Sequence, residues 1–121
     1  MLIKYLLLLS AMTPMLASAV YYSGEELYGL SKSYDNVINK QSSEVSDLIK
    51  FGLYTGYVAG TVDSLNGVKF CLDEKTKQVE ATDVIYMFLR DNQDKLKYSA
   101  PILISDALNR YSPCDGRREM W

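Results

Sequence analysis

The sequence predicts an all-α protein, a small compact bundle of four to five helices closed by one disulfide. In several segments, apolar residues recur at intervals of three and four, which is the spacing of one helix face. Capping residues and helix breakers bound these segments. The chain has 121 residues, which suits a single domain with one core, and it contains two cysteines that can close it.

Residues 1–19 have the features of a secretory signal peptide. Lys4 supplies the positive charge, an apolar run follows, Pro14 breaks it, and Ala17-Ser18-Ala19 has the form of a cleavage site. The alternatives are a membrane anchor or a buried first helix, but the run is too short to cross about 30 Å of hydrocarbon. We therefore expect cleavage after Ala19, no stable membrane insertion, and a single helical domain over residues 20–121.

Export would place Cys71 and Cys114 in an oxidising compartment, where we expect them to form one disulfide. The alternative is a pair of buried free thiols. The spacing excludes a redox-active Cys-x-x-Cys motif.

Two helices are expected in the first half of this domain. Ser23 and Glu26 form a capping box, and Leu27, Leu30 and Tyr34 follow on one face. The second helix is expected over about residues 44–65. Its stretch from Phe51 to Val62 carries no charge, and such a helix is normally buried in the centre of a domain. Its apolar and small residues share helical spacing: Val45, Leu48, Ile49, Gly52, Gly56, Ala59 and Gly60.

Asn66-Gly67 ends that helix, and Gly67 is expected in the left-handed conformation. The third helix is expected over about residues 77–91, with Thr76 as its N-cap. Ser99 is placed to cap a fourth helix, which Pro113 stops. Two polar loops flank the third helix, residues 73–77 before it and residues 91–98 after it.

The composition excludes most enzyme classes. The chain has no histidine, so it lacks the base of Ser-His-Asp and Cys-His sites, and two cysteines cannot hold a four-cysteine zinc site. The net charge of −2, without a basic stripe, argues against nucleic acid as a partner. Carboxylate pairs such as Glu44/Asp47 lie on polar faces, although a small carboxylate-based hydrolase remains an alternative. We expect no catalytic residue, cofactor or metal.

Tyrosine is unusually frequent, with 10 residues. We expect Tyr54, Tyr57 and Tyr111 in or beside the core. The better surface candidates are Tyr21, Tyr22, Tyr28 and Tyr98, because exposed tyrosine favours protein interfaces.

The order of several motifs resembles one known family. Gly56-Tyr57-Val58-Ala59-Gly60-Thr61-Val62-Asp63 is followed by Phe70-Cys71-Leu72, by the helix from Val84 to Leu89, by the Ala-Leu helix from Ala100 to Leu108, and by Pro113-Cys114. This order is similar to that of the Rap/Tai family of type VI secretion immunity proteins. Tyr54 stands where many members have a cysteine, and Asn92-Gln93 stands where the family often has His-Pro.

The resemblance implies a small helical periplasmic protein that binds and blocks a cell-wall (peptidoglycan) amidase toxin, and it implies a possible homodimer. A non-inhibitory envelope protein, or one like a lysozyme inhibitor, is the alternative function. An inhibitor of this kind must plug a cleft, and loops on a rigid scaffold are suited to this. We predict contacts from the two polar loops, through Asp73, Glu74 and Lys75 in the first and Asp94, Lys95 and Tyr98 in the second. The alternative is that these are ordinary solvated turns, in which case Tyr21, Tyr22 and Tyr28 are the next candidates.

Overall fold

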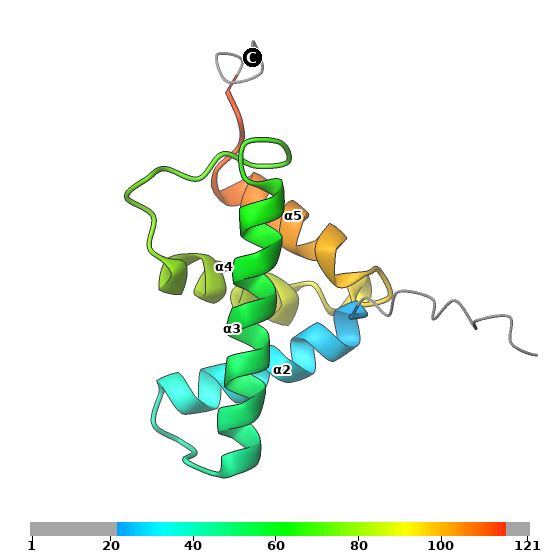
Figure 1. Cartoon of the computed structure of the whole chain (residues 1–121). Coiled ribbons are helices and arrows are strands. Elements are labelled where there is room, and N and C mark those ends of the chain that lie inside the picture. The colour runs from blue at the N-terminus through cyan, green and yellow to red at the C-terminus, as the bar shows by residue number, and fades with distance from the viewer. Residues whose placement is uncertain (1–21, 116–121) are drawn as a thin grey trace, which may run out of the picture.

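The computed structural model describes residues 22–115, which form an all-α bundle with one disulfide. The elements are α2 (Gly24–Ile38), α3 (Val45–Leu65), α4 (Gln78–Asp91), the 3-10 helix η1 (Gln93–Lys95) and α5 (Ala100–Tyr111). In Figure 1, α3 runs the length of the molecule, α2 crosses its lower half, α5 lies beside its upper half and α4 lies behind it. The predicted signal peptide lies outside the described residues.

The start of α2 confirms one half of the predicted capping box. Ser23 is the N-cap, and its Oγ accepts a hydrogen bond from the Glu26 amide at 3.1 Å. The Glu26 carboxylate accepts from Ser23 Oγ at 3.2 Å rather than from the Ser23 amide. The same segment is joined to the beginning of α5. Gly24 N donates to Tyr98 O, and Ala100 N donates to Tyr22 O, both at 2.8 Å. These two bonds pair an N-terminal segment with one near the C-terminus.

Two predicted caps differ from the structure. Lys77, not Thr76, is the N-cap of α4, and it makes no side-chain cap bond. Ser99 is the N-cap of α5 as expected, but its side chain does not cap the helix. Its backbone instead pairs with that of Ser23.

Gly67 has φ +89°, which confirms the left-handed turn after α3.

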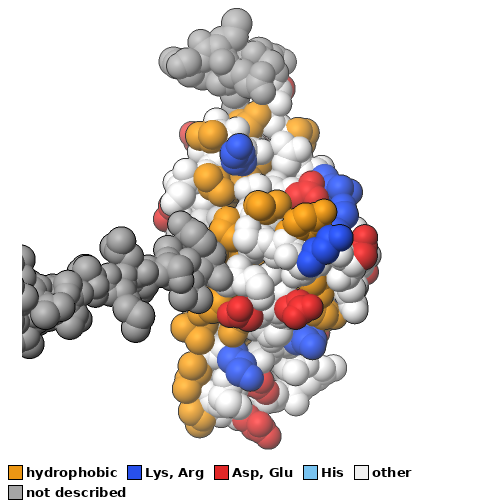
Figure 2. Space-filling model, turned by 90° about the vertical axis from the view of Figure 1, so that its right-hand side faces the viewer, with side chains coloured by type: hydrophobic (Ala, Val, Ile, Leu, Met, Phe, Trp, Pro, Cys, Tyr) orange, Lys and Arg blue, Asp and Glu red, His pale blue; other side chains and the backbone are white. Residues whose placement is uncertain are grey.

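The orientation of α3 overturns one expectation. The helix was expected to be buried, but only Tyr54 and Val58 are buried, and they lie on the side opposite the predicted stripe. The front of Figure 1, where α3 lies, becomes the left-hand edge in Figure 2, and hydrophobic side chains line the lower half of that edge. The three helix glycines, Gly52, Gly56 and Gly60, also face outward. Each destabilises a helix by about 1 kcal/mol relative to alanine.

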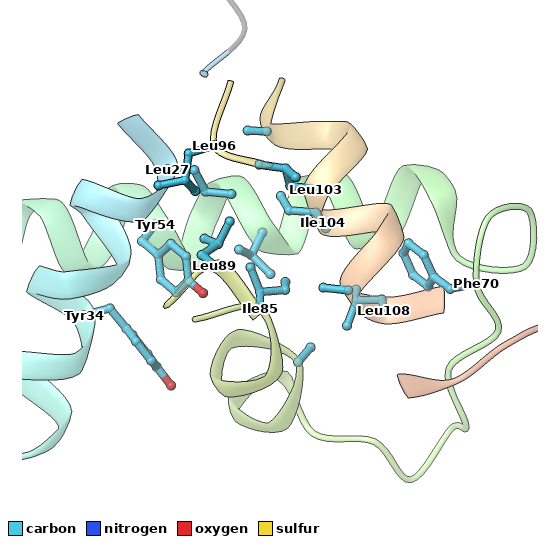
Figure 3. Packing of buried hydrophobic residues seen from close by; sticks show 14 of the residues in the cluster. Leu27, Tyr34, Tyr54, Phe70, Ile85, Leu89, Leu96, Leu103, Ile104 and Leu108 are labelled. Atoms are coloured by element: carbon cyan, nitrogen blue, oxygen red, sulfur yellow. The ribbon is translucent and has the colours of Figure 1, made fainter. Parts of the chain in front are cut away.

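The core lies between α3 and the other three helices (Figure 3). Helices α2, α4 and α5 each contribute side chains at intervals of three and four, as predicted, because this spacing places them on one helix face. Phe70, in the turn after α3, closes the upper end of the core and is fully buried. The largest buried apolar side chains are Leu27, Tyr54, Phe70, Ile85, Leu89, Leu103, Ile104 and Leu108.

Candidate functional site

The loop of residues 73–77 is fastened at its beginning by the disulfide. Cys71 and Cys114 are bonded as predicted, with a Cα–Cα distance of 4.7 Å. Two hydrogen bonds with Ser112 reinforce this link. Cys71 N donates to Ser112 O at 2.9 Å, and Ser112 Oγ donates to Cys71 O at 2.6 Å. The start of the loop is therefore fixed to the end of α5.

The turn beneath the loop is also held by hydrogen bonds. Leu72 N donates to Asn66 Oδ1 at 2.9 Å, and Gly67 N donates to Phe70 O at 2.7 Å. Since Phe70 is fully buried, the turn is anchored in the core. An anchored loop loses less conformational entropy on binding than a mobile one.

The loop itself is compact and presents charged side chains. Asp73 Oδ1 accepts from Lys75 N at 3.1 Å, and Asp73 O accepts from Thr76 N at 2.9 Å. Asp73, Glu74 and Lys75 are all exposed. Within the described part of the chain, none of these three side chains forms a salt bridge. Their charges are available to a partner.

The first half of α4 fixes the other end of the loop. Tyr54 Oη donates to Thr82 O at 2.6 Å, and Tyr34 Oη donates to Asp83 Oδ1 at 2.6 Å. Burial, and to a smaller extent the hydrogen bond to Asp83, raises the pKa of Tyr34 to about 12. Burial also raises the pKa of Tyr54. This network was not predicted, because nothing in the sequence marks Thr82 and Asp83 as partners of residues in α2 and α3.

The second candidate loop is more closely tied to the rest of the fold. Lys95 Nζ lies 3.8 Å from Asp106 Oδ2 and 5.5 Å from the centre of the Phe88 ring. The Tyr98 carbonyl accepts from Gly24, although its side chain is 47% exposed. Asp94 is exposed. Lys95 already has partners within the chain, which any binding partner would have to replace.

The structure does not bring the two loops together. They lie at opposite ends of α4, whose 14 residues span about 21 Å. In Figure 1 they project on opposite sides of α3. The six predicted contact residues therefore form two separate groups of three.

The tyrosines follow the predictions in part. Tyr54 is buried, and Tyr57 packs edge-on against Tyr22 with ring centres 4.8 Å apart. Tyr111 was expected in or beside the core, but it is 47% exposed. The buried stripe of α5 ends at Leu108, one turn earlier. Tyr21 lies outside the described residues.

Residues 22–115 contain no group of three or more side chains placed to hold a metal ion. None of the helices described is long and apolar enough to span a bilayer.

Comparison with curated protein sequences gave no match. The model of one protein family, described as Rap1a immunity proteins, matches residues 23–114. The matched region runs from the N-cap of α2 to the second cysteine of the disulfide, and so contains the whole described bundle. The chain belongs to the Rap1a immunity protein family.

Proposed function

We propose that this chain is a periplasmic immunity protein that binds a peptidoglycan amidase delivered by a type VI secretion system and blocks its active-site cleft. Membership of an immunity family carries the proposal, since an immunity protein acts by binding a toxin. The amidase as target follows from the sequence resemblance. The chain reaches the periplasm after cleavage following Ala19, and it acts there as a homodimer.

The loop of residues 73–77 is the segment that enters the cleft. Hydrogen bonds, the disulfide and the packing of α4 fix its two ends, while Asp73, Glu74 and Lys75 remain exposed. A cleft-blocking segment needs rigidity and accessible side chains, and this loop has both. The loop of residues 91–98 contacts the toxin at the edge of the interface.

Alanine substitution in the two loops tests this assignment. One variant replaces Asp73, Glu74 and Lys75, and the other replaces Asp94, Lys95 and Tyr98. Each serves as the control for the other, since both remove three side chains from loops at opposite ends of α4. Affinity for a purified type VI peptidoglycan amidase is measured by calorimetry, together with the activity of that amidase on purified peptidoglycan.

We expect the first variant to lose at least about thirtyfold in affinity, the loss of a hot spot worth roughly 2 kcal/mol, and to stop protecting peptidoglycan. The second variant should lose less. If the first variant binds within about threefold of the wild type, the loop does not enter the cleft. If the unaltered protein neither binds nor inhibits the amidase, the proposed target is wrong. Release of peptidoglycan fragments by the purified chain alone would favour a hydrolase instead.

A further inference from the structure

Tyr111 is the residue at which the inner face of α5 comes to the surface. It continues the spacing of three and four that buries Ala107 and Leu108, but its own side chain is 47% exposed. Its hydroxyl donates a hydrogen bond to Glu80 Oε2, in the first turn of α4, at 3.4 Å. The ring is therefore held beside the start of α4 and is still half open to solvent.

A hollow of about 500 Å³ lies beside this ring, between the loop of residues 73–77, the start of α4 and the end of α5. Its lining is mainly polar and consists of Asp73, Lys75, Thr76, Glu80, Tyr111 and Ser112. The walls are fixed, because two hydrogen bonds join Ser112 to Cys71 and Thr76 N donates to Asp73 O. Since the loop forms one wall, a partner that receives the loop also meets the hollow.

The charge of the hollow is negative, because Asp73 and Glu80 contribute two carboxylates against the one ammonium group of Lys75. All three side chains are exposed, and within residues 22–115 none of them forms a salt bridge. The Tyr111 ring adds an aromatic face, which attracts cations. No lysine or arginine of the described residues lies over this ring, whereas cations do lie over Tyr28, Tyr86, Phe88 and Tyr98. Free carboxylates beside an uncovered aromatic face are suited to a lysine or arginine side chain.

We propose that this hollow binds one lysine or arginine side chain of the toxin while the loop of residues 73–77 occupies the cleft. The cation lies against the Tyr111 ring and donates to the carboxylates of Asp73 and Glu80. This proposal rests on the proposed function and adds to it a recognition surface outside the loop, on α4 and α5. The hollow distinguishes between toxins by the charge at the rim of their clefts, because an acidic or apolar side chain there gains no partner.

Glu80→Gln tests the charge of the hollow, since it keeps the size of the side chain and an acceptor for the Tyr111 hydroxyl. The matched control is Glu44→Gln, because Glu44 is also exposed and lies at the start of a helix, but at the end of α3 remote from the loop. Binding of each full chain to the purified type VI amidase is measured by calorimetry at about 0.05 M and about 0.5 M salt. We expect Glu80→Gln to lose at least about fivefold in affinity at low salt and to depend less on salt than the wild type, and we expect Glu44→Gln to match the wild type in both.

Two substitutions of Tyr111 test the contribution of the aromatic ring. Tyr111→Phe keeps the ring and removes the hydroxyl, whereas Tyr111→Leu keeps an apolar side chain and removes the ring. Because a cation binds the face of either aromatic ring, we expect Tyr111→Phe to stay within about threefold of the wild-type affinity and Tyr111→Leu to lose at least about tenfold. Circular dichroism checks that each variant is folded.

The result that overturns this proposal differs from the one that overturns the proposed function. If the wild type binds the amidase, and Glu80→Gln and Tyr111→Leu bind within about threefold of it, the hollow takes no cation and the proposed function stands. Equal salt dependence of Glu80→Gln and the wild type, or equal losses in Tyr111→Phe and Tyr111→Leu, also contradict a cation held between carboxylate and ring. If the wild type does not bind the amidase, both proposals fail.

Discussion

Among the described glycines, Gly24 is the one whose replacement by alanine should destabilise the fold most. A Cβ there would lie 2.5 Å from Leu103 Cδ1, 2.5 Å from the Leu96 carbonyl oxygen and 2.8 Å from Leu96 Cα. Two of these atoms belong to the backbone, and Gly24 N is itself bound to Tyr98 O, so neither side can move freely. Gly24→Ala must therefore push the start of α2 away from the loop before α5.

The expected loss can be estimated from these contacts. Overpacking of this kind destabilises by about 1–3 kcal/mol, and the helix propensity gained by alanine offsets at most about 1 kcal/mol of it. We expect a net loss of about 2 kcal/mol, which lowers the melting temperature of a domain of this size by roughly 10 °C. Thermal and urea unfolding, followed by circular dichroism without reductant, measures both quantities.

Gly29→Ala is the matched control, because Gly29 lies in the same helix and no atom is within 4 Å of its Cβ position. It should raise the free energy of unfolding by up to about 1 kcal/mol. The two substitutions are chemically identical and should have opposite signs. If Gly24→Ala leaves the melting temperature unchanged or raises it, the close packing of α2 against Leu96 and Leu103 is wrong.

Three further predictions concern the groups that hold the candidate loop. Replacing both Cys71 and Cys114 with alanine opens a loop of about 44 residues and should lower the free energy of unfolding by up to about 4 kcal/mol; reductant should destabilise the wild type to the same extent and leave the variant unchanged. Tyr34→Phe removes the phenol hydroxyl between α2 and α4 and should cost about 1–3 kcal/mol in urea unfolding, whereas Tyr28→Phe, at a half-exposed ring, should change stability by less than about 0.5 kcal/mol. Because the pKa of Tyr34 is about 12 in the folded chain and near 10 in the unfolded one, its contribution is fully present below pH 10 and is lost as the pH rises towards 12; this alkaline loss should be smaller in Tyr34→Phe.

Local signals in the sequence predicted the elements well. Ser23 and Glu26 marked the start of α2, and Gly67 marked the turn after α3, because capping and left-handed turns depend on neighbouring residues. The apolar spacing of α5 also identified its buried residues as far as Leu108, but Tyr111, at the end of the same spacing, is exposed.

The direction in which α3 packs could not be predicted in the same way. A helix without charge from Phe51 to Val62 gives no contrast between its faces, so apolar spacing alone does not show which side meets the core. Tyr54 and Val58 occupy the buried side, where the Tyr54 hydroxyl also satisfies Thr82 O. That bond depends on the placement of α4, which is a long-range property of the fold.

The candidate site, too, could be predicted from the sequence only where it depends on neighbouring residues. The charged loop at residues 73–77 and its disulfide followed from composition and spacing. The role of Tyr34 and Asp83 in fixing α4 depends on a contact between residues 49 positions apart in the sequence. The spacing of residues along the sequence does not predict such contacts.

The pairing of Ser23 with Ser99 has a consequence for the order in which the chain folds. The first helix of the domain is completed only by a segment about 75 positions later, and contacts between such distant positions slow folding because a long loop must close first. The disulfide partner Cys114 is synthesised later still. A growing chain that ends before α5 therefore lacks one of the two backbone hydrogen bonds that hold the start of α2, and it also lacks the disulfide. If the protein is exported as proposed, the disulfide forms only after the chain has crossed the membrane, because the compartment that the chain leaves is reducing.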